Sequence, residues 1–128
     1  MNYNVNRTNG NLLTVVQDQQ VVADKCPVKL VGYGSMNTGE VQNENLVHII
    51  EHFASNSQPA NPIIGLLWYD SVKQILKVCT QESPAVFKPI AFINISEPLS
   101  PEVGMVWWDG TKLKVHNGTV WVDIGPIS

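Results

Sequence analysis

A short block of residues occurs twice in this 128-residue chain and limits the folds that the chain can adopt. The first copy reads Gly-Leu-Leu-Trp-Tyr-Asp at residues 65–70, and the second reads Gly-Met-Val-Trp-Trp-Asp at residues 104–109. A Leu-Lys-Val triplet follows each copy, and a proline stands three residues ahead of each glycine. Such a repeat indicates that one small β-unit is used twice, and units of this kind serve assembly and surface recognition more often than catalysis.

Each copy is expected to form a three-stranded β-meander. The first strand carries the Trp-aromatic-Asp triplet, the second carries Leu-Lys-Val, and the third carries Phe87 in one copy and Trp121 in the other. Asp109-Gly110 is a strong signal for a two-residue hairpin turn. Because Asp70 and Asp109 immediately precede predicted turns, their carboxylates are expected to cap backbone N–H groups there.

Neighbouring side chains on a strand point to opposite faces, so the two aromatic rings of each triplet cannot share one core. One ring of each pair is expected to face inward, and the other to face solvent or a neighbouring subunit. A buried Trp removes roughly 200 Å² from water, worth up to ~5 kcal/mol, yet an isolated meander remains marginal. The residues expected to anchor the repeats and their intersubunit contacts are Trp68, Tyr69, Trp107, Trp108 and Trp121.

One amphipathic helix is predicted, at about residues 43–55. Asn43 is expected to cap its N-terminus by accepting a hydrogen bond from a backbone N–H group. Apolar residues recur at i, i+3, i+4 and i+7, which makes a single apolar stripe. This stripe is expected to pack against the N-terminal strands or across a trimer axis, and it consists of Leu46, Ile49, Ile50 and Phe53.

Together these patterns predict a mainly β fold of the α+β class in three segments. Residues 1–57 form an N-terminal strand-loop-helix module, with short strands at about 12–16, 21–23 and 28–31. Residues 62–96 form the first, Trp-Tyr-Asp β-repeat, and residues 97–128 form the second, Trp-Trp-Asp β-repeat.

The charge and cysteine content of the chain argue against several classes of function. Charged residues make up only 15% of the chain against about a quarter in soluble domains, which indicates that a partner covers part of the surface. The net charge of −3 and the lack of a Lys/Arg cluster argue against nucleic-acid binding. The sequence shows no secretory signal and no apolar run long enough to insert into a membrane. Cys26 and Cys79 fit neither a zinc ribbon nor a redox motif and form either a disulfide or two free buried thiols.

Two sets of residues suggest other functions. The pattern His-x-x-Glu-His at residues 48–52 matches an inverted zinc-protease motif, but such enzymes need a distant third ligand and a far larger fold. The aromatic rings, with Asp70, Asp109 and Asn117 nearby, suggest a sugar-stacking platform. The competing interpretation is that one ring of each triplet lies in the core and the other makes an interface contact. We therefore expect no enzyme activity, no catalytic or metal-binding residue and no cofactor.

Several blocks, taken in order, resemble a module of known proteins. They are Leu-Val-Gly at residues 30–32, Gly-Glu-Val-Gln-Asn-Glu-Asn at 39–45 leading into the helix, and Gly-Leu-Leu-Trp-Tyr-Asp at 65–70. In this order they look like a tail-fibre module of the virion structural proteins of contractile-tailed bacteriophages. The resemblance covers about residues 12–78, and the second Trp-Trp-Asp unit is similar in style.

The resemblance implies a virion protein, assembled in the host cytoplasm, that works by self-association, usually as a homotrimer, and by docking to other tail, neck or baseplate proteins. In the family, this module often stands ahead of a shaft and a receptor-binding tip, whereas the sequence here runs through the second unit to Ser128, so a shaft and a tip are not expected in this chain. The expectation is therefore a tail fibre, whisker, or neck or baseplate accessory. The alternative is a glycan-binding adhesin module that contacts the host surface through the exposed Trp and Tyr rings.

Overall fold

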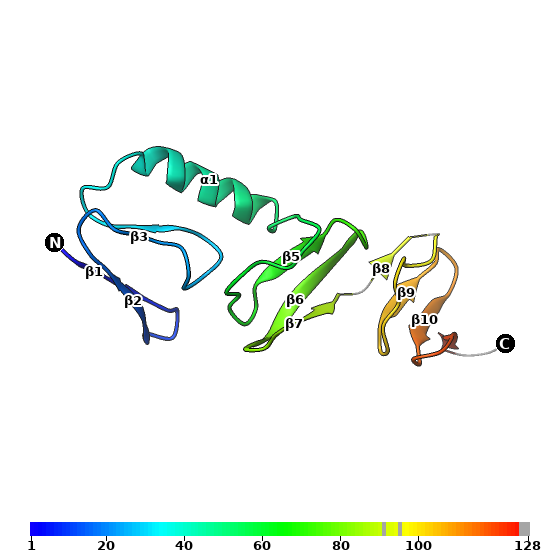
Figure 1. The fold of residues 1–128 in the computed structure, drawn as a ribbon. Helices are drawn as coiled ribbons and strands as arrows, with labels where there is room; N and C mark the ends of the chain where they lie inside the picture. Colours follow the sequence, from blue (N-terminus) through cyan, green and yellow to red (C-terminus); the bar gives the residue numbers. More distant parts are fainter. Residues whose placement is uncertain (91, 95, 126–128) are drawn as a thin grey trace.

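The structure is a computed structural model that describes residues 1–90, 92–94 and 96–125, and it confirms a mainly β fold (Figure 1). Within these residues, the single helix α1 spans Thr38–Ile50 and separates short N-terminal strands from two larger sheets. The strands are β1 (Tyr3–Asn6), β2 (Leu12–Val16), β3 (Val21–Val22), β4 (Leu30–Val31), β5 (Leu67–Asp70), β6 (Ile75–Glu82), β7 (Ala85–Pro89), β8 (Phe92–Ile93), β9 (Val106–Trp108), β10 (Leu113–His116) and β11 (Trp121–Ile124).

The molecule is elongated, with its termini at opposite ends (Figure 1). The N-terminal hairpins and α1 occupy one end, the sheet β5–β7 the middle, and the sheet β8–β11 the other end. Among the described residues, the pairs of elements in extensive contact are all neighbouring strands of one sheet. The chain is thus a row of small units and not layers packed around one large core.

The N-terminal unit consists of two antiparallel hairpins, β1–β2 and β3–β4. Gly32 lies so close to the chain after β2 that an added Cβ would stand 2.0 Å from the carbonyl oxygen of Gln17, so only glycine fits there. The helix is tied to this unit by Asn45, whose side chain accepts from the backbone N–H of Lys29 at 3.1 Å and donates to its carbonyl at 2.7 Å.

The helix starts earlier than the sequence pattern predicts, and the expected cap is wrong. Its N-cap residue is Asn37, which has a left-handed backbone and makes no side-chain capping bond. Asn43 lies inside the helix, where its backbone N–H is no longer one of the free N-terminal groups. None of the helical residues is buried, and Leu46, Ile49 and Ile50 are about half or more exposed. The stripe therefore does not pack against the N-terminal strands within one chain.

The predicted helix is also too long at its C-terminal end, because the chain leaves it before Phe53. His52 and Phe53 have φ values of 50° and 52°, which turn the backbone away from the helical path. The carbonyl of His52 then accepts from the N–H of Tyr69 at 2.9 Å, and Ser55 forms a parallel bridge with Asp70. Phe53 thereby belongs to the first large sheet, where it packs against a buried cluster and not on the helical stripe.

The two large sheets share one topology. In each, three antiparallel strands form a meander, in the order β5-β6-β7 and β9-β10-β11. The second sheet adds β8, which pairs in parallel with β9, as the bridge at Ser55 does with β5. Phe92–Ile93 thus belongs to the second sheet, although the sequence pattern places the boundary between the repeats at residues 96 and 97.

The strand pairing extends the repeat beyond the blocks at residues 65–70 and 104–109. Residues 53–62 align without a gap with residues 92–101, so that Phe53 matches Phe92 and Pro59 matches Pro98. Each unit therefore consists of a short parallel lead segment, a proline-rich link and a three-stranded meander.

Candidate assembly surfaces

The inner face of the first sheet holds a buried Trp–Lys–Asp unit. Trp68 lies directly opposite Lys77 in the β5–β6 register, and the Lys77 ammonium stands 5.3 Å from the indole centroid. The same ammonium forms an ion pair of 3.2 Å with Asp70. All three side chains are nearly fully buried, and Trp68 packs edge-on against Phe87 with centroids 5.3 Å apart. A cation over an indole face and beside a carboxylate neutralises the buried charges locally.

The second sheet contains an equivalent Trp–Lys–Asp unit. Lys114 lies opposite Trp107, with its ammonium 5.0 Å from the indole centroid and 3.1 Å from the Asp109 carboxylate. The ring of Trp107 packs edge-on against Trp121 with centroids 5.1 Å apart. Lysine is the member of the unit that the sequence interpretation missed, although both Leu-Lys-Val triplets carry it in the same place.

Both aspartates also close the turn that follows them. Asp70 accepts from the N–H groups of Val72 and Lys73, each at 3.1 Å. Asp109 accepts from the N–H groups of Thr111 and Lys112 at 2.8 and 2.7 Å.

These contacts set the acidity of the two carboxyls. Burial raises the pKa of Asp70, but the N–H of Lys73 and the Lys77 ammonium outweigh it, so that pKa is lowered from its ordinary value. The N–H groups of Lys112 and Thr111 hold the pKa of Asp109 well below its usual range, against a smaller effect of burial. Both carboxylates are therefore engaged in ion pairs and in the turns of the fold.

The second aromatic ring of each triplet points outward. Trp68 and Trp107 are 6% and 7% exposed, whereas Tyr69 and Trp108 are 37% and 41% exposed. The inward rings build the sheets, and the outward rings are free for a partner.

In the second sheet, the outward Trp108 is part of a wholly apolar face. Directly opposed residues share a face of a sheet, and the register gives two cross-strand rows on this side. The rows are Trp108–Leu113–Ile124 and Val106–Val115–Val122. No charged side chain belongs to either row, and their members are half-buried or exposed in the single chain. We call these six residues the second outer face.

The first sheet presents a matching surface. Its register places Tyr69 beside Leu76, and Leu67 beside Val78 and Lys88. Ile90 extends the first row, because its N–H donates to the carbonyl of Leu76 at 3.0 Å. We call the five apolar residues Leu67, Tyr69, Leu76, Val78 and Ile90 the first outer face. Lys88, on the edge strand β7, stands where the second sheet has Val122.

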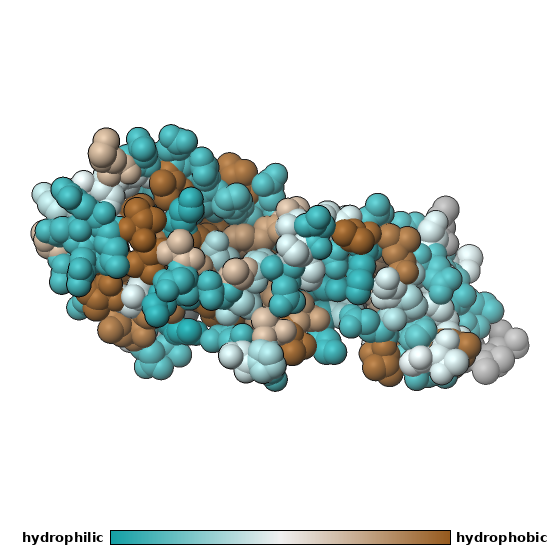
Figure 2. Space-filling model, viewed as in Figure 1, coloured by the Kyte–Doolittle hydropathy of each residue, from teal (hydrophilic) through white to brown (hydrophobic). Residues whose placement is uncertain are grey.

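A third apolar surface lies around α1. Leu46, Ile49 and Ile50 are 57%, 49% and 75% exposed, and Ile49 borders a groove of about 430 Å³. The groove runs between the loop at Cys26 and the start of the first sheet at Leu66 and is lined almost wholly by apolar groups. Apolar surface is also spread along the visible side of the molecule in Figure 2, from the N-terminal unit to the second sheet.

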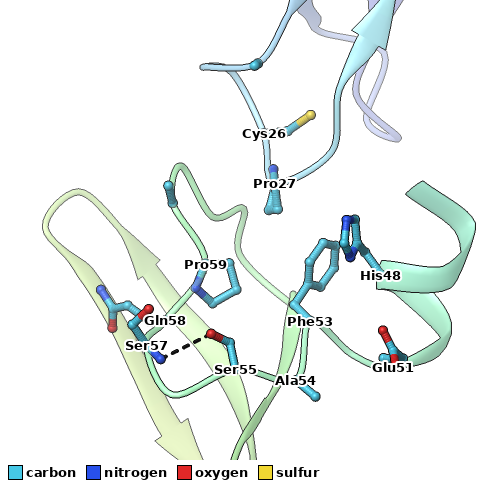
Figure 3. A pocket seen from close by; sticks show the side chains of 12 residues that line it. Cys26, Pro27, His48, Glu51, Phe53, Ala54, Ser55, Ser57, Gln58 and Pro59 are labelled. Carbon is cyan, nitrogen blue, oxygen red and sulfur yellow. Dashed lines mark hydrogen bonds between the residues drawn. The ribbon is translucent and has the colours of Figure 1, made fainter. Parts of the chain in front are cut away.

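A more polar pocket of about 520 Å³ lies beside the end of α1 (Figure 3). Its wall includes Phe53, whose ring stacks on His48 with centroids 6.3 Å apart, and the loop that contains Cys26. The Cys26 thiol donates to the backbone carbonyl of Val28 at 3.4 Å.

The geometry required for zinc binding does not form at residues 48–52. His48 lies in the last turn of α1, but His52 has left the helix, so the two rings do not share a helical face. In the described part of the chain, no group of three His, Cys, Asp or Glu side chains is placed to hold a metal ion. Cys26 and Cys79 are buried free thiols and form no disulfide.

The residues suggested as a sugar-stacking platform are divided between two faces. Asp70 and Asp109 turn inward to their lysines, on the side opposite to Tyr69 and Trp108. Asn117 accepts from the N–H groups of Thr119 and Val120, each at 2.9 Å, and so closes the β10–β11 turn. These three residues are therefore not available beside the exposed rings to orient the hydroxyl groups of a sugar.

Comparisons with protein-family models, curated proteins and solved structures found no match for this chain. Within the described residues, no helix has the length and apolar character needed to cross a bilayer.

Proposed function

We propose that this chain is a structural protein of a bacteriophage virion, a tail fibre, whisker, or neck or baseplate accessory, that acts by self-association and by docking to other virion proteins. Its working form is a homotrimer located in the virion, and it carries out no catalysis. The resemblance of residues 12–78 to a tail-fibre module motivates the identity.

The observation that carries the proposal is the pair of outer faces. Two successive sheets along an elongated chain each present an apolar face whose members are half-buried or exposed in the single chain. Soluble proteins rarely leave such continuous apolar surface in water, so it marks a site of association. Small units that share no extensive core, and that stand in a row, gain stability from neighbours in a bundle.

The second candidate is a glycan-binding adhesin module that uses Tyr69 and Trp108. The exposure of these two rings favours it, because sugars stack on exposed aromatic faces. The inward orientation of Asp70 and Asp109 argues against it.

The test is the solution mass of the purified, tag-free protein by light scattering coupled to size exclusion. The proposal predicts three times the chain mass of 14.2 kDa, unchanged on dilution to micromolar concentration. A monomer would contradict the proposal and favour the adhesin. A glycan array, followed by titration of tryptophan fluorescence, would then test that alternative directly.

A further inference from the structure

We infer that the first and second outer faces are the contact surfaces between copies of this chain, which lie parallel and in register around a common long axis. This inference rests on the proposed self-association and specifies its surface and its geometry. The groove beside α1 meets this contact surface at Leu67, which lines the groove and belongs to the first outer face.

The chemistry of the two faces selects an apolar partner. The second outer face contains only Trp, Leu, Ile and Val, whereas the inner face of the same sheet carries the paired charges of Lys114 and Asp109. The first outer face is apolar up to its edge, where Lys88 stands on the last strand, β7. An apolar centre with charge confined to the rim is the usual composition of a stable protein interface.

The available area requires both sheets. The six most exposed members of the two faces, each 37–46% exposed, together present on the order of 500 Å², and the five half-buried members raise this toward the about 800 Å² per partner of a stable interface. The second face supplies four of these six residues and is too small alone for a specific contact. A partner must therefore engage both sheets at once.

The repeat itself indicates that this partner is another copy. The two faces carry equivalent residues at the same places in the strand register: Tyr69 and Trp108, Leu76 and Leu113, Ile90 and Ile124. The sheets also stand one after the other along an elongated molecule (Figure 1). A parallel copy in register presents the same spacing and brings each face to its equivalent. Cyclic symmetry about an axis along the molecule generates this arrangement and closes it.

The first test places charge on the second outer face. Leu113→Glu combined with Val122→Glu puts one carboxylate on the inner strand β10 and one on the edge strand β11 of the second outer face, where an unpaired charge in an apolar contact is strongly unfavourable. The matched control is Leu99→Glu, because Leu99 is 62% exposed and lies in the link outside both faces, whereas Leu113 is 37% exposed. The double variant is expected to run at the mass of one chain and the control at the mass of the wild-type oligomer.

The second test uses variants that leave the faces nearly intact. Leu76→Cys and Leu113→Cys are made in one chain, which is oxidised in the assembled state and digested, and the cross-linked peptides are identified by mass spectrometry. Parallel packing in register yields 76–76 and 113–113 links between chains, and an antiparallel or shifted arrangement yields 76–113 links. The native cysteines are buried, so they do not compete. Leu99→Cys is the control that forms no such link.

The outcomes separate the inference from the function on which it rests. A wild-type monomer contradicts both. A wild-type oligomer that survives Leu113→Glu/Val122→Glu, or that gives 76–113 links, overturns the inferred surface or geometry and leaves self-association standing. If the charged double variant loses its β-sheet circular dichroism, the cysteine links alone decide.

Discussion

The two sheets share one strand topology but have different side chains in their cores. In the first, Cys79 lies opposite Phe87, and in the second His116 lies opposite Trp121 in the matching place. His116 contacts Trp121 edge-on with centroids 5.1 Å apart, and its Nδ1 accepts from the N–H of Gly118, so a hydrogen-bonded polar ring replaces a thiol. The Trp–Lys–Asp unit and the turn closed by its aspartate are common to both sheets.

This comparison teaches which contacts define the unit. The third strand and its aromatic residue change between the copies, as does the length of the loops. The strand register, the cation over the indole and the aspartate-capped turn do not change. The constant parts form a frame that specifies the hairpin, and the variable parts adjust how each core is filled around it.

The largest effect is expected from removal of the inward rings. Trp68→Ala or Trp107→Ala deletes the residue on which both the core and the lysine depend, and a buried Trp→Ala change costs about 3–5 kcal/mol. Because each sheet is small, either variant is expected to lose its sheet and the assembly with it. Thermal unfolding followed by far-ultraviolet circular dichroism, together with light scattering, measures both losses.

The outward rings are the matched controls for this prediction. Tyr69→Ala and Trp108→Ala remove rings of similar size that are more than a third exposed in the chain, so the sheets are expected to remain folded while association weakens. An inward variant that still assembles with normal stability would refute the assignment of Trp68 and Trp107 as the anchors of the two units.

The sequence predicts the repeated strands and their turns because alternation and Asp-Gly pairs are local signals. The lead segments are not predicted, since a parallel pairing of two residues has no period of its own. The apolar stripe predicts that Phe53 is helical, because Phe53 continues its spacing. The start of the helix at Thr38 is not predicted, because Gly39 lies in its first turn and glycine disfavours a helix. Which ring of each aromatic pair faces inward depends on the pairing of distant strands, and alternation alone leaves both choices open.

Replacement of the two aspartates is expected to destabilise the two sheets by different amounts. Asp70→Asn leaves the ammonium of Lys77 buried without its counter-ion, which costs about 3 kcal/mol or more. Asp109→Asn is expected to cost less, because the side chains of Lys114 and Asp109 are 23% and 16% exposed against 8% and 6% for Lys77 and Asp70. Urea denaturation of the two variants at equal protein concentration measures the difference, and equal losses would contradict it.

Acid provides an independent readout of the same carboxylates. Their pKa values are lowered in the folded chain, so their contribution to the free energy of unfolding is complete above the unfolded value of about 4 and is lost as pH falls through the folded values. The wild-type protein is expected to lose stability below about pH 4, and each Asn variant to show a shallower loss.

The smallest expected difference in stability concerns the indole N–H groups of Trp68 and Trp107. Trp107 donates its Nε1–H to the carbonyl of Asn94 at 2.7 Å, whereas the Nε1–H of Trp68 is buried without an acceptor among the described residues. The carbonyl of Ser55, which aligns with Asn94, instead accepts from the N–H of Ser71 at 3.0 Å.

Replacement by phenylalanine tests this difference, because it removes the N–H group in both sheets and takes away a similar part of each ring. Trp107→Phe also leaves the Asn94 carbonyl without its donor, and is expected to lose about 1 kcal/mol more than Trp68→Phe. The readout is the shift in urea midpoint at constant slope. Equal shifts would mean that the hydrogen bond of Trp107 contributes nothing measurable, and that the two frames are energetically the same despite their different surroundings.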